Sequence, residues 1–224
     1  MKLFVDTGSV EEVRQAAQWG VLDGVTTNPS LIAKSGKGFR ETVLSMCAIL
    51  PEGAISAEVV AVDTDGMLKE GREIRSWAPN IVVKIPMTSA GIAATRILSD
   101  EGTRINMTLV FSLSQALLAA KAGASFISVF VGRVDDASGD GMKTVADVVN
   151  MIEDYDFDSE ALVASIRHPM HVVEALRVRA HISTMPYSVL KQLFQHPLTD
   201  IGAERFLADW NAAGLKIFEE AGAR

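Results

Sequence analysis

Hydrophobic and polar positions along the chain form eight short apolar runs, each followed by a longer amphipathic segment. The runs are rich in β-branched residues and almost continuously apolar, which is typical of strands buried on both faces of a parallel sheet. We expect strands over residues 3–6, 24–28, 54–60, 80–86, 104–111, 125–131, 161–167 and 181–185. Helix start signals lie between the runs, among them the capping box of Ser9 and Glu12 and the prolines at 29, 169 and 186.

Strict alternation of strands and helices predicts a parallel sheet with right-handed crossovers, and eight such units close into a (β/α)8 TIM barrel. A doubly wound open sheet is the alternative fold, but it usually has fewer strands, and its glycine-rich dinucleotide motif is missing. The spacings leave no room for a second domain, so we expect one barrel domain over residues 1–224. Residues 199–221 exceed the barrel and predict an extra amphipathic C-terminal helix, which must bury its apolar face on the barrel or on a neighbouring subunit.

Composition and charge narrow the range of partners. The 224 residues are 48% hydrophobic and 22% charged, with a net charge of −7 and no run of Lys or Arg, which argues against nucleic acid or an anionic membrane as a partner. A small phosphorylated ligand needs only one or two local cations and is not excluded. No segment has the length of a membrane span or the pattern of a signal peptide. Cys47 is the single cysteine, so we expect a cytoplasmic protein without disulfides.

The run at residues 80–86 contains one lysine, Lys84, between apolar β-branched residues. Burial of an unpaired ammonium is costly, so Lys84 must be paired, lie at a strand end, or be neutral. A neutral buried amine can attack a carbonyl group and form a Schiff base. A lysine that snorkels out of the strand end is the simpler interpretation of this run taken alone.

Polar residues at the carboxyl ends of the predicted strands decide between the two interpretations, because this is where TIM barrels place their active sites. Strand periodicity puts residues two apart on one face, so three pairs of these residues can point into one barrel mouth. Polar inward residues on six or seven strands are costly unless they serve a ligand. The residues are Asp6, Asn28, Glu58, Lys84, Asn106, Thr108, Ser128, Phe130, Ser165 and Arg167.

Several motifs resemble those of the small transaldolases, in the family that also includes the fructose-6-phosphate aldolases. They are Asp6-Thr7, GVTTNP at 24–29, AEVV at 57–60, VKIPMT at 83–88, NMTLVF at 106–111, FVGRVDD at 130–136 and ASIRHP at 164–169. The resemblance covers essentially the whole chain. It implies a (β/α)8 barrel, a lysine Schiff base, no metal or other cofactor, phosphorylated sugars as substrates, and homo-oligomers built from rings of five, often paired.

The resemblance also implies a role for each matching residue. Lys84 would attack the C2 carbonyl of a ketose phosphate, and Asp6 would take the C4 hydroxyl proton as the C3–C4 bond breaks. Glu58 with Thr108 would hold a proton-shuttling water. The retained three-carbon unit would be bound by Asn28, Asn106 and Ser128, in a pocket that also contains Phe130. The phosphate would be bound by Arg133, Ser165 and Arg167, since guanidinium groups and a hydroxyl suit its oxygens.

Several of these residues also have a simpler structural interpretation. Asn28 before a proline can cap a helix, and Asp6 can cap the first helix at the surface. Thr108 can be an ordinary β-branched core residue. Arg133 can form a surface ion pair with the acidic residues at 135 and 136, worth about 0–1 kcal/mol. The functional interpretation accounts for all of them together.

Other motifs favour neither a metal nor a nucleotide. The loop at 35–38 lacks the spacing of a phosphate-binding P-loop. Residues 136–141 imitate the start of a calcium loop but follow a strand rather than a helix. His168 and His171 flank a helix start without a third histidine, which argues against zinc, and His168 is the expected N-cap.

Three functions follow from the resemblance. The leading one is a transaldolase of the pentose phosphate pathway, which transfers a dihydroxyacetone unit from sedoheptulose 7-phosphate or fructose 6-phosphate to an aldose phosphate. A fructose-6-phosphate aldolase would release free dihydroxyacetone, but that branch typically has Gln in place of Glu58 and Tyr in place of Phe130. A non-catalytic sugar-phosphate-binding barrel would be expected to have lost Lys84 or Asp6.

Overall fold

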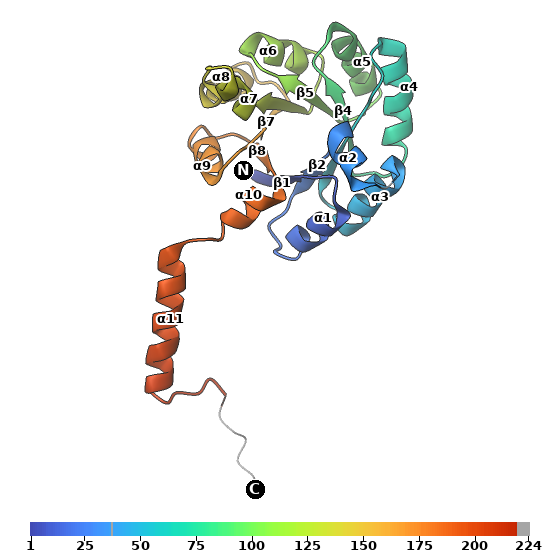
Figure 1. The fold of residues 1–224 in the computed structure, drawn as a ribbon. Helices are drawn as coiled ribbons and strands as arrows, with labels where there is room; N and C mark the ends of the chain where they lie inside the picture. Colours follow the sequence, from blue (N-terminus) through green and yellow to red (C-terminus); the bar gives the residue numbers. More distant parts are fainter. Residues whose placement is uncertain (37, 219–224) are drawn as a thin grey trace. The chain divides into compact units, whose positions relative to one another are not determined.

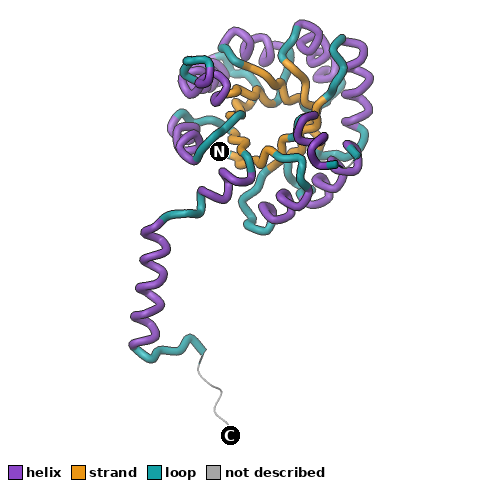
Figure 2. The backbone as a smooth tube through the Cα atoms, in the orientation of Figure 1, coloured by secondary structure: helices purple, strands orange, loops and turns teal. Residues whose placement is uncertain are grey.

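The computed structural model describes residues 1–36 and 38–218 and confirms the predicted (β/α)8 barrel. Eight parallel strands pair in sequence order, and β8 pairs with β1 to close the ring. Helices surround this ring in Figures 1 and 2. The strands are β1 (Lys2–Asp6), β2 (Gly24–Thr26), β3 (Ala54–Glu58), β4 (Ile81–Pro86), β5 (Ile105–Val110), β6 (Phe126–Phe130), β7 (Glu160–Ala164) and β8 (Ile182–Met185).

Each of the first five strands leads into a helix that a side chain caps, and α8, which follows β6 and α7, is capped in the same way. The capping oxygen accepts a backbone N–H of the first helical turn, which satisfies a donor that the helix itself leaves unpaired. The caps of α1, α2, α4, α5, α6 and α8 are Ser9, Asn28, Asp63, Thr88, Ser112 and Asp140. The helices are α1 (Val10–Ala17), α2 (Pro29–Ser35), α3 (Phe39–Ile49), α4 (Thr64–Arg75), α5 (Ser89–Asp100), α6 (Leu113–Lys121), α7 (Val131–Asp136), α8 (Gly141–Asp154), α9 (Pro169–Arg177), α10 (Tyr187–Gln192) and α11 (Pro197–Ala212).

Two buried layers follow from the alternation of side chains along the strands. The larger layer packs the outer face of the sheet against the helices. The smaller one contains Phe4, Val82, Phe126, Leu162 and Ile182. Each of these five lies two residues before a polar or small residue of the same strand, so the apolar plug lies below the polar mouth of the barrel.

Register brings three of the predicted site residues to one level. Glu58 pairs with Lys84, and Lys84 pairs with Asn106, on the adjacent strands β3, β4 and β5. Asp6 pairs in the same way with Thr26 across β1 and β2. Residues paired in register point to the same face of a parallel sheet, so the site is set by the order of the strands.

Several strands end before the predicted residue: β2 ends at Thr26 instead of residue 28, and β3 ends at Glu58 instead of residue 60. Two further differences affect the site. Residues 131–136, expected as a strand end and a loop, form the short helix α7 directly after Phe130. Strand β7 ends at Ala164 instead of continuing to residue 167, because Ser165 has a φ of 59°, which a strand residue cannot adopt. The expected common strand face of Ser165 and Arg167 is therefore wrong.

The described chain divides into two compact units, Met1–Leu190 and the segment from Lys191 onward. In the second unit α11 covers Pro197–Ala212, so the helix is shorter than the 199–221 expected, and residues 219–221 lie outside the described residues. Gly214 has a φ of 65° just beyond the last turn and supplies the left-handed residue that ends many helices. No helix among the described residues is long and apolar enough to cross a membrane.

Candidate active site

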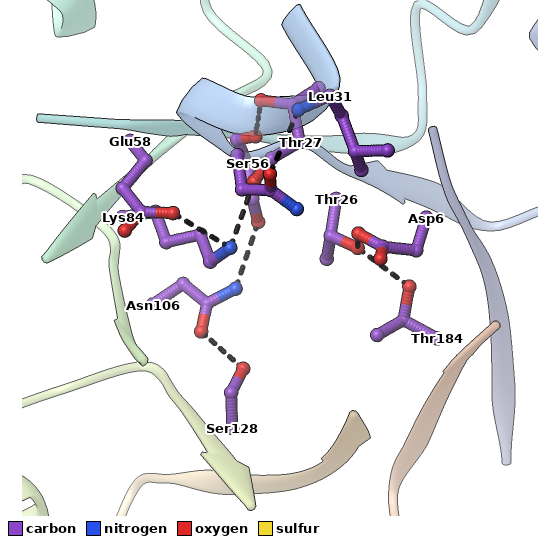
Figure 3. A network of polar contacts seen from close by, with 11 residues as sticks. Asp6, Thr26, Thr27, Leu31, Ser56, Glu58, Lys84, Asn106, Ser128 and Thr184 are labelled. Carbon is purple, nitrogen blue, oxygen red and sulfur yellow. Dashed lines mark hydrogen bonds and ion pairs between the residues drawn. The ribbon is translucent and has the colours of Figure 1, made fainter. Parts of the chain in front are cut away.

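Lys84 is the most buried of the described lysines, with 4% of its surface exposed. Its Nζ lies 2.9 Å from Glu58 Oε2 and donates a 2.8 Å hydrogen bond to the backbone oxygen of Thr27 (Figure 3). The ammonium is therefore paired and does not snorkel to solvent. Glu58 holds the Lys84 nitrogen inside the closed barrel, and an amine next to a proton acceptor has the geometry that a nucleophile requires.

Asp6 faces the same mouth from β1. Its Oδ1 accepts a 2.7 Å hydrogen bond from the Thr26 hydroxyl, and Thr26 Oγ1 lies 2.7 Å from Thr184 Oγ1 (Figure 3). Burial raises the pKa of Asp6, while the positive charge of Lys84 and the Thr26 hydrogen bond oppose this rise. Since Ser9 caps α1, the surface-cap interpretation of Asp6 is wrong. A buried carboxyl with a raised pKa is suited to accept and return a proton.

A fixed polar chain crosses the floor of the site. Asn106 donates through Nδ2 to the Ser56 hydroxyl at 3.1 Å, and the Ser128 hydroxyl donates to Asn106 Oδ1 at 2.6 Å. All three residues are buried, with at most 1% of their surface exposed. These bonds hold the Asn106 amide in place before any ligand binds.

Thr108 carries an unpaired polar atom within the described part of the chain. Its Oγ1 is buried and has no hydrogen-bond partner among the described residues, as is also the case for the core threonines Thr42 and Thr95. The next residue, Leu109, has a φ of 60° and lies in a β-bulge between β5 and β6. Bulges redirect side chains next to active sites.

Asp6, Lys84 and Ser128 line a cavity of about 150 Å³ at the carboxyl ends of the strands. The predicted site residues Glu58, Asn106 and Thr108 are not among its lining residues. Asn28 lines the cavity and also caps α2, because its Oδ1 accepts the Leu31 N–H at 3.0 Å. Only the NH2 group of its amide then remains for a ligand. The lining residues are Asp6, Thr26, Asn28, Lys84, Ser128, Phe130, Arg133, Ala164, Ser165 and Thr184.

The predicted phosphate ligands are arranged differently from the sequence expectation. Arg133 and Ser165 line the cavity, but Arg167 does not. Arg167 Nη2 lies 2.6 Å from Asp136 Oδ2, in an ion pair whose side chains are half exposed. The ion pair expected for Arg133 is thus formed by Arg167. Both arginines adjoin α7, the helix that the sequence did not predict, so their placement depends on that element.

Sequence reasoning missed Thr26, Ser56 and Thr184, which support Asp6 and Asn106. Thr26 and Ser56 each lie two residues before a predicted site residue, Asn28 and Glu58 respectively, and Ser56 shares its strand face with Glu58. Considering the residues two positions before each predicted site residue would have identified both. A threonine in a strand is ordinary, however, and its type alone signals no function.

The described residues form no group of side chains that could hold a metal ion. Among residues 1–36 and 38–218, no three His, Cys, Asp or Glu side chains converge to hold an ion. In the loop that imitates a calcium site, Asp140 caps α8 through the Lys143 N–H at 2.8 Å. His168 occupies the expected N-cap position of α9, but its side chain makes no capping hydrogen bond.

The sequence model of the family described as Transaldolase/Fructose-6-phosphate aldolase matches residues 3–221. The chain belongs to this family. It is 53% identical to a probable transaldolase of Aquifex aeolicus, over 97% of this chain and 100% of the relative. A probable transaldolase of Thermoanaerobacter is 52% identical over 97% of this chain and 100% of the relative. One of Methanococcus maripaludis is 53% identical, with 95% and 98% covered.

Among solved structures, a thiamine phosphate pyrophosphorylase from Pyrococcus furiosus is similar in fold. The TM-score is 0.57 at 17% sequence identity, over 83% of this chain and 85% of that chain. An identity this low supports the barrel fold and nothing about the reaction. The family resemblance seen in the sequence motifs is confirmed by the family match and by the relatives.

Proposed function

We propose that this protein is a transaldolase that moves a dihydroxyacetone unit from a ketose phosphate to an aldose phosphate. The observation that carries the proposal is the buried Lys84, paired with Glu58 at 2.9 Å in a cavity that Asp6 also lines. Family membership and relatives described as probable transaldolases support it. Sedoheptulose 7-phosphate and fructose 6-phosphate are the proposed donors, as in the pentose phosphate pathway.

In the proposed first step, Lys84 adds to the C2 carbonyl of the donor as a neutral amine. Glu58, ion-paired with the same nitrogen, accepts the proton that Lys84 must lose. The carbinolamine then loses water to give an iminium. We propose that Glu58 and the unpaired Thr108 hydroxyl hold the water that carries protons in this exchange.

Cleavage follows when Asp6 takes the proton of the C4 hydroxyl. The C3–C4 bond breaks, its electron pair moves into the iminium to give an enamine on Lys84, and an aldose phosphate leaves. The acceptor aldehyde then adds to the enamine carbon, Asp6 returns the proton, and water releases the new ketose phosphate. A carboxyl whose pKa is raised by burial suits both directions of this transfer.

The retained three-carbon unit carries hydroxyls that need fixed partners. Ser128 and Asn106, linked by a 2.6 Å hydrogen bond, are proposed to bind them together with the NH2 group of Asn28. For the phosphate we propose Arg133 and Ser165 from the cavity wall. Arg167 joins them by exchanging its Asp136 carboxylate for the phosphate, which accepts the same guanidinium donors.

The fructose-6-phosphate aldolase branch of the family is the second candidate. Phe130 lines the cavity, packs against Phe111 with ring centroids 5.7 Å apart, and has no proton to deliver to the enamine. A tyrosine, typical of the aldolase branch, would have one. Together with Glu58, this residue favours transfer over release of free dihydroxyacetone.

We also propose a cellular location and an oligomeric state for this protein. A buried cysteine without a possible disulfide partner fits the cytoplasm. We propose a homo-oligomer of five or ten chains, by family resemblance. In the described chain α11 buries none of its side chains although it carries Phe206 and Trp210, so it lacks a core of its own. Sedimentation equilibrium counts the subunits.

The first prediction tests the Schiff base directly. Borohydride reduction with fructose 6-phosphate should add a reduced three-carbon unit to Lys84, located by peptide mass spectrometry. Lys84→Ala should show no adduct and lose transfer to erythrose 4-phosphate. In the wild type a coupled assay should show more transfer than free dihydroxyacetone. An adduct on another lysine, or a fully active Lys84→Ala, contradicts the proposal.

A further inference from the structure

The turn after β7, residues 165–167, holds two of the proposed phosphate ligands and leads into a helix that lacks a side-chain cap. Ser165 adopts a φ of 59°, which is strained for a non-glycine residue. The helix that follows, α9, receives no capping hydrogen bond from its N-cap side chain, His168. Six other helices at this face are capped by their own loops. Another group must therefore hold this turn in place.

His171, in the first turn of α9, contacts the turn directly. The side chain is buried, with 7% of the residue exposed. Its Nδ1 accepts the backbone N–H of Arg167 at 3.3 Å, and its Nε2 lies 3.4 Å from Asp135 Oδ2. The other oxygen of Asp135 accepts the Gly141 N–H at 2.9 Å. One imidazole thus joins the turn after β7 to α7 and to the start of α8.

The direction of the hydrogen bond to Nδ1 identifies the protonation state of the His171 imidazole. A neutral imidazole has one N–H donor and one acceptor nitrogen. Nδ1 accepts from Arg167, so the proton is on Nε2 and faces the Asp135 carboxylate. A doubly protonated ring would present a second N–H to the Arg167 N–H and would lose that bond.

We propose that neutral His171 is a positioning residue for phosphate recognition, which holds the 165–167 turn so that Ser165 and Arg167 can bind the phosphate of the acceptor. This inference rests on the proposed transaldolase function. His171 does not line the cavity and acts only through the turn. Its loss should therefore affect phosphorylated substrates more than unphosphorylated ones.

The charged groups around His171 set its response to pH. Burial lowers the pKa of His171, and the neighbouring His168 and Arg167 lower it further. Asp135 on α7 and Glu174 on α9 oppose this effect. Because the net direction is downward, the neutral ring persists at neutral pH and the turn loosens only under acidic conditions.

The test compares Asn and Leu at position 171. The Asn amide oxygen is as many bonds from Cβ as the His Nδ1, so His171→Asn keeps an acceptor for the Arg167 N–H, and His171→Leu removes it. For His171→Leu we expect the KM for erythrose 4-phosphate to rise about five- to tenfold. The KM for glyceraldehyde should change by less than about twofold. His171→Asn should restore most of the lost affinity.

A matched control lies at the other end of the same strand. His181 Nδ1 accepts the Ala161 N–H at 3.0 Å, so it forms the same kind of bond near the start of β7. His181→Leu should lower Tm without changing the KM ratio of the two acceptors. If it changes that ratio as His171→Leu does, the effect is one of stability and the inference is wrong.

The pH dependence of KM distinguishes protonation of His171 from protonation of the substrate phosphate. The KM ratio of wild type to His171→Asn for erythrose 4-phosphate should rise as pH falls, and titration of the phosphate itself cancels in this ratio. A second readout needs no turnover: amide exchange of Arg167, followed by NMR, should accelerate in His171→Leu and not in His171→Asn. Failure of the borohydride adduct in the wild type would refute the proposed function. An active wild type with unchanged acceptor KM values and unchanged Arg167 exchange in His171→Leu would refute this inference alone.

Discussion

The carboxylate of Asp6 receives a hydrogen bond from Thr26, and Thr26 in turn lies against Thr184. A hydroxyl has one proton, and Thr26 donates its own to Asp6, so Thr184 must donate to Thr26 while Asp6 is ionised. When Asp6 is protonated, both bonds can reverse direction. The chain thereby stabilises both protonation states of the carboxyl.

This arrangement predicts a pH effect for Thr26→Val. The Thr26 hydrogen bond opposes the rise that burial causes in the pKa of Asp6, so its removal raises that pKa further. Asp6 must be ionised to accept a proton, so the acid limb of kcat against pH should move to higher pH. Thr26→Ser keeps the hydroxyl and serves as the control. Thr184→Val should move the limb in the same direction but less, and an unmoved limb in Thr26→Val would exclude this role.

Residue chemistry at the strand ends was largely predictable. Asp6, Glu58, Lys84 and Asn106 stood out because a polar residue in an apolar strand is costly unless it is used. The partner of Arg167 was not predictable, because Asp136 lies 31 positions away in the sequence and only the fold brings them together. The support given by Thr26 was hidden because threonine is common in strands.

Helix α7 and the end of β7 meet at Gly132. A Cβ at this position would overlap the Ser165 carbonyl oxygen and come within 2.6 Å of Arg167 Nε. The backbone of Ser165 already has a strained φ and has little room to shift. The close approach of these two elements therefore requires glycine.

Gly132→Ala should consequently cost about 1–3 kcal/mol of unfolding free energy, as overpacking does. It should also raise the KM for erythrose 4-phosphate more than the KM for glyceraldehyde, because the displaced atoms belong to the 165–167 turn, which holds two of the proposed phosphate ligands. Gly38→Ala is the matched control, since it has an ordinary φ of −63° and open space around its Cβ position. Urea unfolding and steady-state kinetics measure both effects, and a Gly132→Ala variant that behaves like Gly38→Ala would disprove the requirement.

Elements were predictable where one physical signal dominated. The eight strands were found because each is buried on both faces and reads as a continuous apolar run. Helix α7 was missed because Val131 and the glycine after it read equally well as a strand end and a loop. The bulge at Leu109 was missed for a similar reason: its apolar side chain fits a regular strand, and only its φ of 60° breaks the pattern.

At the scale of the whole molecule, Cys47 reports on the integrity of the barrel unit. The thiol is 5% exposed on α3, and burial raises its pKa to about 11. The thiolate is the reactive form, so both access and ionisation protect Cys47 in the folded state.

We expect that a maleimide labels native Cys47 slowly at pH 7.5 and that denaturant accelerates labelling in parallel with loss of helical circular dichroism. In the unfolded chain the reaction should reach one label per molecule, because the chain has a single cysteine. Rapid labelling at full helicity would mean that α3 opens independently of the rest.

Local side-chain caps affect how such a barrel can evolve. They are found at the start of α1, α2, α4, α5, α6 and α8. Each cap binds a backbone group three residues further along the same connection, for example Ser112 to the N–H of Gln115. The connections on the catalytic face are thus closed locally, and none depends on its neighbour for this bond. Mutations can therefore rewrite one connection at a time while the adjacent ones keep their shape. A face built in this way can acquire a new substrate by piecemeal change, and the shared barrel below it need not be rebuilt.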